Sequence, residues 1–141
     1  MNEEVVQSIK QEALNDNIPI ILDDTLNALN SVLAELKPNK ILEIGTATGY
    51  SAICFSRYLE INGKIDTIEK DPIRIEKAKE NIQKLNLQDT ITIYEGDALG
   101  ILPNLENTYD LVFIDAVKSK YPIFLEHAIR LTRSRRIYNS R

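Results

Sequence analysis

The chain has 141 residues, which suits one domain with a real hydrophobic core. Hydrophobic residues make up 43% and charged residues 27%, and the formal net charge of -4 excludes a general electrostatic attraction to nucleic acid. No apolar run approaches the roughly 20 residues of a membrane span, and the acidic start lacks the apolar core of a signal peptide. We therefore expect a cytoplasmic protein with no membrane partner. Lone Cys54 excludes an internal disulfide, and no Cys/His cluster suggests zinc.

Two amphipathic helices are predicted at the start of the chain. The first carries apolar residues at helical spacing between Val5 and Ala13, and the second carries an apolar stripe from Leu26 to Leu36. Pro38 cannot continue a helix, so the second one is expected to end before it.

Strands and helices are predicted to alternate from Lys40 onward. The predicted strands are KILEIG, KIDTIEKD, TITIYEGD and YDLVFIDA, and the predicted helices are YSAICFSRYLE, PIRIEKAKENIQKLNL and YPIFLEHAIRL. This alternation predicts an α/β fold, with right-handed crossovers around a doubly wound, mostly parallel Rossmann-like sheet. Residues 1–141 show no repeat or linker, so we expect a single domain.

The strand ends are the positions where a ligand is expected. Ligands of open parallel sheets bind beyond the carboxyl ends of the strands, near the point where the strand order reverses. The polar and glycine positions that follow the predicted strands are Glu43 to Gly49, Glu69, Asp97 and Asp115.

The first strand-to-helix turn contains Gly45 and Gly49. Glycine lets the backbone approach a ligand closely, although a lone G-x-x-x-G pattern is also that of a plain tight turn. Glu69 adds weight, because an acidic group about 20 residues further on accepts hydrogen bonds from a ribose diol. Together these residues indicate a ligand with an adenosine part.

The loop favours S-adenosylmethionine over a pyrophosphate ligand. Ala47 stands where the G-x-G-x-x-G fingerprint needs glycine, and the loop lacks the lysine of a phosphate-binding P-loop. Glu43 is unusual inside an apolar strand, so it orients either the loop or the cationic end of the ligand, unless its role is purely structural. Asp97 places an acidic side chain near the expected adenine position.

The motifs ILEIGTATGYSAICFS, IDTIEKDP, GDALGILP and YDLVFIDAVKSKYP together resemble bacterial O-methyltransferases related to catechol O-methyltransferase. That family includes tRNA 5-hydroxyuridine methyltransferases, and the match runs from about Ile18 to Leu131. The resemblance implies a class I methyltransferase fold that binds S-adenosylmethionine and a divalent metal ion, usually Mg²⁺.

The resemblance also implies which residues bind the methionine side of the cofactor. Glu43, Gly45 and Ser51 would line that side, with Tyr50 close by. Ile21, in the segment IPII, would lie at the edge of the cofactor.

The remaining site residues that the resemblance implies lie after later strands. Glu69 would hold the ribose hydroxyls, and Asp97 and Ala98 would flank the adenine. Asp115 would bind the cofactor and act catalytically as the first metal ligand, and Lys118 would be the general base.

The implied chemistry is coherent for a hydroxyl acceptor. A hard cation on carboxylate oxygens acidifies a phenol-like hydroxyl, and a nearby lysine with a lowered pKa can take the proton. Asp115 and Lys118 are three residues apart, a spacing that can direct both toward one crevice, although Lys118 read alone resembles a solvated loop lysine. The acceptor would be a catechol-like small molecule or a hydroxylated uridine in tRNA.

Residues 132–141, TRSRRIYNSR, depart from the family pattern. The family continues there with a Gly-Gly turn, a fifth strand and an Asp-Asn pair of metal ligands. We therefore expect a domain that lacks its last strands and has impaired methyl transfer. Permitted codons for this tail, read one base later, encode Leu-Glu-Ala-Gly-Gly-Phe-Ile-Ile-Ala, so we hypothesise an out-of-frame segment that sequencing of the gene would test.

The predicted fourth strand would be an exposed apolar edge in such a domain. Open edges pair with other chains, so we expect either a homo-oligomer, most simply a dimer, or an edge covered by the tail.

Two other functions remain open at this point. The chain could be a non-catalytic cofactor-binding or interaction module, since metal ligands of the family pattern are absent. It could also be a dinucleotide-dependent oxidoreductase, although the missing G-x-G-x-x-G fingerprint argues against that class.

Overall fold

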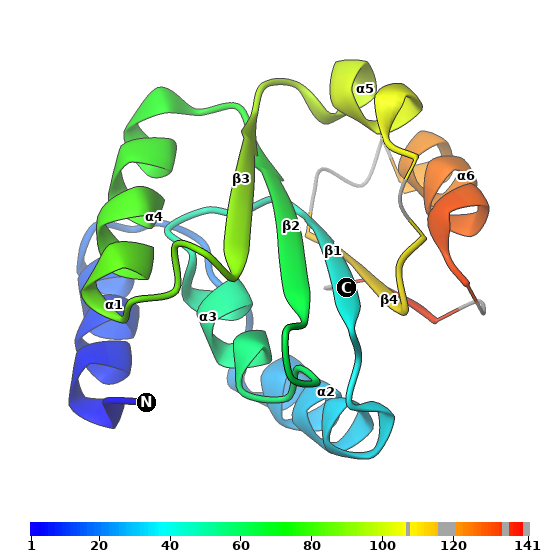
Figure 1. Cartoon of the computed structure of the whole chain (residues 1–141). Helices are drawn as coiled ribbons and strands as arrows, with labels where there is room; N and C mark the ends of the chain where they lie inside the picture. Colours follow the sequence, from blue (N-terminus) through cyan, green and yellow to red (C-terminus); the bar gives the residue numbers. More distant parts are fainter. Residues whose placement is uncertain (107, 116–120, 134–135, 140–141) are drawn as a thin grey trace.

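The central feature of the structure, a computed structural model that describes residues 1–106, 108–115, 121–133 and 136–139, is a sheet with helices on both faces (Figure 1). Its strand order is β3-β2-β1-β4-β5, and each neighbouring pair is parallel. The elements in chain order are α1 (Glu3–Asn15), α2 (Asp23–Leu36), β1 (Lys40–Ile44), α3 (Tyr50–Ser56), β2 (Lys64–Glu69), α4 (Pro72–Lys84), β3 (Ile91–Glu95), α5 (Ala98–Ile101), the 3₁₀-helix η1 (Leu102–Asn104), β4 (Leu111–Ile114), α6 (Tyr121–Leu131) and β5 (Ile137–Asn139).

The two faces of the sheet carry separate hydrophobic clusters. Ile41 of β1 points into a cluster shared with α1, α2, α3 and α4, and the next residue, Leu42, points into a cluster shared with α5, η1 and α6. This alternation follows from the two-residue period of a strand. Edge-to-face packing of Phe55 on Phe113, with ring centroids 5.5 Å apart, joins α3 to β4. The predicted doubly wound α/β fold is therefore confirmed.

The long helices form where the apolar periodicity predicts them. The Asn2 side chain caps α1, and the Asp71 side chain caps α4 with Pro72 in its first turn. Lys37 ends α2 in a left-handed conformation with φ of 46°, directly before Pro38. None of the described helices is both long and apolar enough to cross a bilayer.

Helix α3 is shorter than predicted. It ends at Ser56, whereas the sequence pattern suggested a helix that continued to Glu60. The backbone amide of Glu60 instead donates to the carbonyl of Pro38 at 2.9 Å, and Gly63 donates to Glu60. These bonds turn the chain back toward the start of β2 and so end the helix early.

Strand β5 is the element that the sequence did not predict in residues 132–141. Val112 of β4 donates to the carbonyl of Arg136 at 2.9 Å, and Phe113 is paired in register with Tyr138. Described residues of the tail thus cover the edge of β4, which is one of the two outcomes expected for that edge. The expectation that no strand lies beyond β4 was wrong for this three-residue segment.

Candidate functional site

The predicted site residues lie side by side along the carboxyl edge of the sheet. Gly45 donates to the carbonyl of Ile68 at 2.9 Å, and Asp115 donates to the carbonyl of Ile44 at 2.8 Å. Gly96, next to Asp97, donates to the carbonyl of Glu69 at 2.8 Å. Because these bonds link neighbouring strand ends, β1, β2, β3 and β4 present their predicted residues in sheet order.

The turn from β1 to α3 depends on the absence of a side chain at Gly45. This residue has φ of 101°, and a Cβ atom there would overlap the backbone carbonyl oxygen of Asp115. Gly49 has φ of 87°, and Ala47 between them is also left-handed, with φ of 49°. The loop is therefore a tight cradle against the end of β4, as predicted from the glycine spacing.

Glu43 lies inside a fully buried hydroxyl network. Its carboxyl group accepts hydrogen bonds from the Ser51 and Thr67 hydroxyls, the latter at 2.8 Å. Thr67 Oγ1 in turn lies 2.6 Å from Thr46 Oγ1, which belongs to the Gly45–Gly49 loop. The network joins β1, β2, α3 and the loop, and it links Glu43 to the loop through Thr67 and Thr46.

Burial raises the pKa of Glu43 to about 8, because the charged form loses its hydration. The Ser51 and Thr67 hydrogen bonds oppose this shift, while the charges of Asp115 and Glu69 add to it. Acidic groups from three strand ends are thus close enough to repel one another. Such a cluster is electrostatically suited to a cationic ligand.

Glu69 ties the loop to the end of β2. One carboxylate oxygen accepts from the backbone amide of Ala47 at 2.8 Å, and the other accepts from Lys70 at 3.1 Å and Asp71 at 3.2 Å. A carboxylate has about four acceptor positions, so this one can still accept a bond from a ligand hydroxyl. Glu69 is 8% exposed, which leaves it at the rim of the loop.

The other predicted cofactor residues make contacts that also serve the fold, as a helix cap or as part of the hydrophobic core. Asp97 is exposed and caps α5 by accepting from the Leu99 amide at 3.0 Å, and Ala98 begins that helix. Ile21 and Tyr50 are both buried in the cluster on the α1–α4 face. Tyr50 therefore packs beside the loop.

Of the predicted catalytic pair, the structure describes Asp115 but not Lys118. Asp115 is partly exposed at the end of β4, whereas Lys118 lies outside the described residues. In the described part of the chain, no group of three or more His, Cys, Asp and Glu side chains could hold a metal ion. These residues alone therefore do not fit a complete Mg²⁺ site.

Sequence reasoning missed two polar residues that support the loop. They are Thr67 and Asn81, both buried. Thr67 could have been found from its place one strand over, since it is paired in register with Glu43. Asn81 is a polar residue within the apolar stripe of α4, and its side-chain amide donates to the carbonyl of Thr48 at 2.9 Å.

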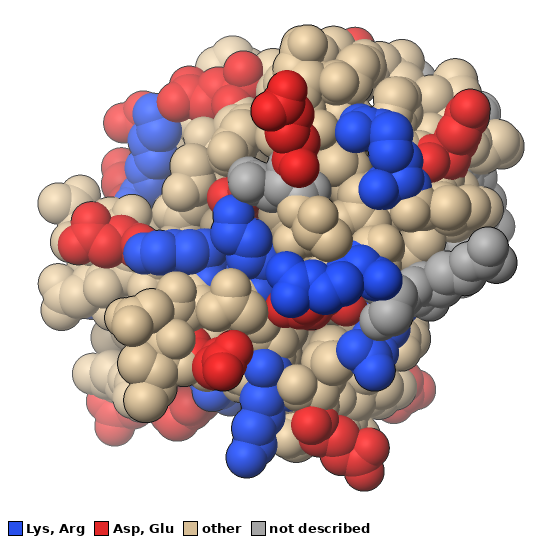
Figure 2. Space-filling view, turned by 45° about the vertical axis from the view of Figure 1, so that its right-hand side comes forward, with Lys and Arg blue, Asp and Glu red and all other residues tan. Residues whose placement is uncertain are grey.

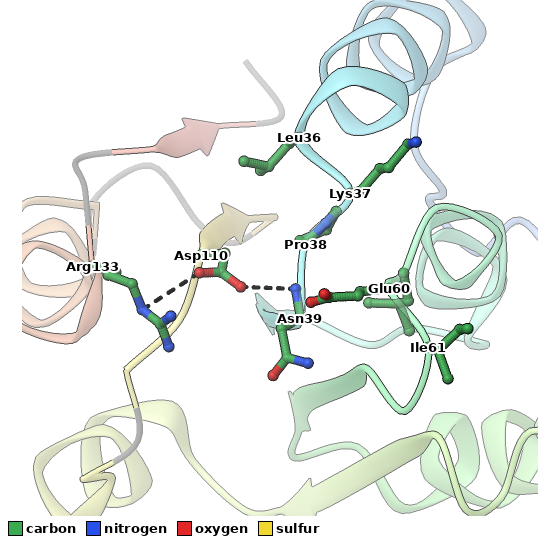
Figure 3. Close-up of a pocket in the computed structure, with 9 residues that line it drawn as sticks. Leu36, Lys37, Pro38, Asn39, Glu60, Ile61, Asp110 and Arg133 are labelled. Atoms are coloured by element: carbon green, nitrogen blue, oxygen red, sulfur yellow. Dashed lines mark hydrogen bonds and ion pairs between the residues drawn. The ribbon is translucent and has the colours of Figure 1, made fainter.

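A cavity of about 630 Å³ lies at the opposite, amino-terminal edge of the sheet (Figure 3). Asp110 lies in its wall, accepts from the backbone amides of Asn39 and Lys40, and pairs with Arg133 at 3.5 Å. The Asp110 and Arg133 charges thus neutralise one another. We place the candidate site at the carboxyl edge, where acidic side chains gather beside a glycine cradle.

Comparisons with known proteins identify the family of the chain. The O-methyltransferase family profile matches residues 2–139. Catechol O-methyltransferase of Niastella koreensis is 39% identical over 107 residues, which covers 72% of this chain and 48% of that protein. Catechol O-methyltransferase of Mycobacterium tuberculosis is 37% identical over 99 residues, with 70% and 45% coverage.

Solved structures share the fold. The O-methyltransferase from Bacillus cereus in complex with SAH superposes with a TM-score of 0.84 at 29% identity, covering 94% of this chain and 63% of that chain. TomG from Streptomyces achromogenes, an O-methyltransferase in complex with SAM, gives 0.83 at 28% identity, with 94% and 62% coverage. The chain spans about half the length of the curated relatives it matches. By profile, sequence and fold, this chain belongs to the O-methyltransferase family.

Proposed function

We propose that this chain binds S-adenosylmethionine (SAM) at the carboxyl edge of its sheet as part of an O-methyltransferase for catechol-like hydroxyl acceptors. The observation that carries the proposal is the glycine cradle of Gly45 and Gly49, held by Glu69 above the buried carboxyl group of Glu43. The names of the relatives, catechol O-methyltransferases, support the acceptor class.

The residues present fit SAM, whose chemical contribution when bound is an electrophilic methyl group on a sulfonium centre. The missing side chain at Gly45 lets the loop lie directly against the Asp115 carbonyl, so that the loop and the end of β4 would border the ligand together. Glu69 would accept bonds from the ribose hydroxyls, and Asp97 and Ala98 would flank the adenine. Glu43 and Ser51 would orient the methionine part, with Tyr50 and Ile21 packed at its edge.

The acidic cluster would favour the cation over its neutral analogues. The charges of Asp115 and Glu69 help to keep the buried Glu43 carboxyl group protonated by raising its pKa, and a positively charged ligand would lower that pKa and favour the carboxylate. Glu43 is fully buried, so its carboxylate form would interact with the ligand's positive charge with little solvent screening. Lys118 remains our proposed general base for the acceptor hydroxyl, and Asp115 our proposed contributor to a divalent metal site. The described residues do not complete such a site, so no step is assigned to a metal ion.

A small acceptor is favoured over tRNA. Figure 2 shows Lys and Arg side chains in a row across one face, with Asp and Glu side chains beside the row. A surface for extended RNA needs a mainly positive field, whereas this chain has a net charge of -4. Methylation of a hydroxylated tRNA would therefore contradict the acceptor proposed here.

Calorimetric titration with S-adenosylhomocysteine (SAH), the product form of the cofactor, tests the binding proposal. We expect saturable 1:1 binding by the wild-type chain and none of comparable strength with NAD. Absence of SAH binding would overturn the proposal. Turnover is tested separately, by mass spectrometry of catechol incubated with SAM, Mg²⁺ and the chain.

The chain by itself is expected to turn over poorly, because it spans about half of the relatives' length. The described residues do not complete a metal site, which favours a second candidate function, a non-catalytic SAM-binding module. Metal-dependent methylation of catechol separates the two candidates, since a module would bind SAH without any product. Family membership argues against the dinucleotide-dependent oxidoreductase, the remaining alternative.

Self-association remains our proposal for the chain in solution. Among the described strands, β5 is the outermost on its side of the sheet and pairs with β4 over three residues, and such an outer strand is where a second copy would pair. Helix α6 also exposes Ile123, Leu125 and Ile129. Sedimentation equilibrium should reveal a dimer, and a monomer at all concentrations would contradict this.

A further inference from the structure

Helix α4 packs against the outer side of the Gly45–Gly49 loop through two neighbouring positions. Asn81 is 1% exposed, and its Nδ2 atom donates to the carbonyl oxygen of Thr48 at 2.9 Å. One turn earlier on the same face, Ala78 lies in ordinary contact range of Gly49, 3.6 Å from the place of an added Cβ. The helix therefore touches the loop at both of its last residues.

The loop is held by three side chains, each acting on a different residue. Thr67 holds Thr46 through its hydroxyl, Glu69 holds the amide of Ala47, and Asn81 holds the carbonyl of Thr48. The first two belong to β2, whereas Asn81 is the one that comes from a helix outside the sheet.

We propose that Asn81 is a positioning residue for the cofactor, which holds the Gly45–Gly49 loop in its binding conformation through the carbonyl of Thr48. This inference rests on the proposed function. It deepens that function because it assigns the loop's shape to a residue that does not touch the ligand site itself.

The reason is that Asn81 does not compete with the ligand. Glu69, the tether of Ala47, is also the residue proposed to accept the ribose hydroxyls, so its hold on the loop is shared with the ligand. Asn81 is buried against the loop, so we expect its bond to Thr48 to persist whether or not the ligand is present.

The chemistry of the contact makes the tether sensitive to substitution. Thr48 is 2% exposed, so its carbonyl would lose a buried partner if the Asn81 amide were removed. Among buried side-chain atoms of the described residues, Thr48 Oγ1 and Asn81 Oδ1 have no hydrogen-bond partner. The hydrogen bond from the Asn81 amide to the Thr48 carbonyl is thus not backed up by a second hydrogen bond from either of these two side-chain oxygens.

The test is Asn81→Leu, which keeps similar volume and removes the donor. We expect SAH to bind about 10-fold more weakly, as befits the loss of one buried hydrogen bond. In the ligand-free protein, we expect the Gly49 amide, which donates to Thr46 at 2.9 Å, to exchange its hydrogen about 10-fold faster. Asn81→Ala serves as a second variant if Asn81→Leu does not fold.

Ile82→Val is the matched control, because Ile82 is the next residue of α4 and is 3% exposed in the core. It should lower the thermal midpoint while leaving the Gly49 exchange rate and SAH affinity within about twofold of wild type. A purely structural role for Asn81 predicts the same pattern for both positions.

The outcomes separate the two proposals. In one outcome, the wild type binds SAH and the Asn81 variants keep the same SAH affinity and the same Gly49 exchange rate. This result overturns the positioning role of Asn81 but leaves the proposed function standing. Failure of the wild-type chain to bind SAH overturns the proposed function and, with it, the positioning role. Faster exchange and weaker binding in the Asn81 variants, with Ile82→Val unaffected, supports the inference.

Discussion

At both the amino-terminal and the carboxyl-terminal edge of the sheet, a carboxylate accepts hydrogen bonds from backbone amides, but its surroundings differ between the two edges. At the amino edge, Asp110 accepts the backbone amides of Asn39 and Lys40 and pairs with Arg133. At the carboxyl edge, Glu69 likewise accepts three backbone amides, but the charges that act on its neighbour Glu43 are acidic. A carboxylate that holds backbone amides is thus not evidence of a site. What distinguishes the carboxyl edge is that acidic side chains gather there beside a loop that begins and ends with a left-handed glycine.

Replacing Gly45 with alanine should have the largest effect and would test the cradle directly. The added Cβ overlaps the Asp115 carbonyl, and φ of 101° is strained for alanine, so we expect a loss of about 3 kcal/mol in unfolding free energy. Urea denaturation measures it. Gly100→Ala is the control, since nothing lies within 4 Å of its added Cβ, and it should change stability by less than about 1 kcal/mol. Equal effects at both positions would contradict the cradle.

Exchanging the two carboxylates for amides sharpens the comparison. Glu69→Gln and Asp110→Asn should each cost about 1–2 kcal/mol of unfolding free energy, because both leave backbone amides with a poorer acceptor. SAH affinity should fall about 10-fold for Glu69→Gln and stay within about twofold for Asp110→Asn. Titration calorimetry on both variants decides, and a similar loss of affinity at Asp110 would refute the assignment of the site to one edge.

Glu43→Gln should change how the stability of the protein depends on pH, because it removes the buried carboxyl group. Since the pKa of Glu43 is raised to about 8 in the fold, the unfolded chain ionises first as the pH rises. The contribution of this raised pKa to the free energy of unfolding is therefore fully present below the unfolded pKa near 4.5, and it is lost as the pH rises toward 8. The wild type should lose up to about 1 kcal/mol per pH unit relative to Glu43→Gln between pH 5 and 8. Parallel stability curves for the two proteins would disprove the shift.

Arg133→Ser should have the smallest effect. The Arg133 side chain is 61% exposed, and such ion pairs contribute about 0.5 kcal/mol or less. We expect a barely altered denaturation midpoint and unchanged SAH affinity. A loss above about 1 kcal/mol, or any clear change in affinity, would mean that the amino edge matters more than its neutralised charges suggest.

The sequence predicted the elements whose apolar period is long. Helix α4 and strand β4 were found because their apolar patterns repeat or run unbroken, and Glu43 because a carboxyl group is out of place in such a strand. Helix α5 has four residues, too few to show a period, although Asp97 before it is a capping signal. Strand β5 could not be predicted, since its three residues become a strand only by pairing with β4.

The supporting residues of the site were harder to predict than the site itself. Glu69 and Gly45 follow strands directly, where ligand chemistry is expected. Asn81 acts across 33 positions of sequence on a backbone carbonyl, a contact with no residue-type signature. Only the packing of α4 on the loop reveals it.

The closeness of Gly45 to the Asp115 carbonyl also limits how this protein can vary. Position 45 cannot accept another residue while the chain after β4 keeps its path. In a library of random variants, substitutions there should survive only together with changes near position 115 that move this carbonyl away. Two segments separated by 70 residues therefore behave as one unit of variation, joined by a space that no side chain can enter.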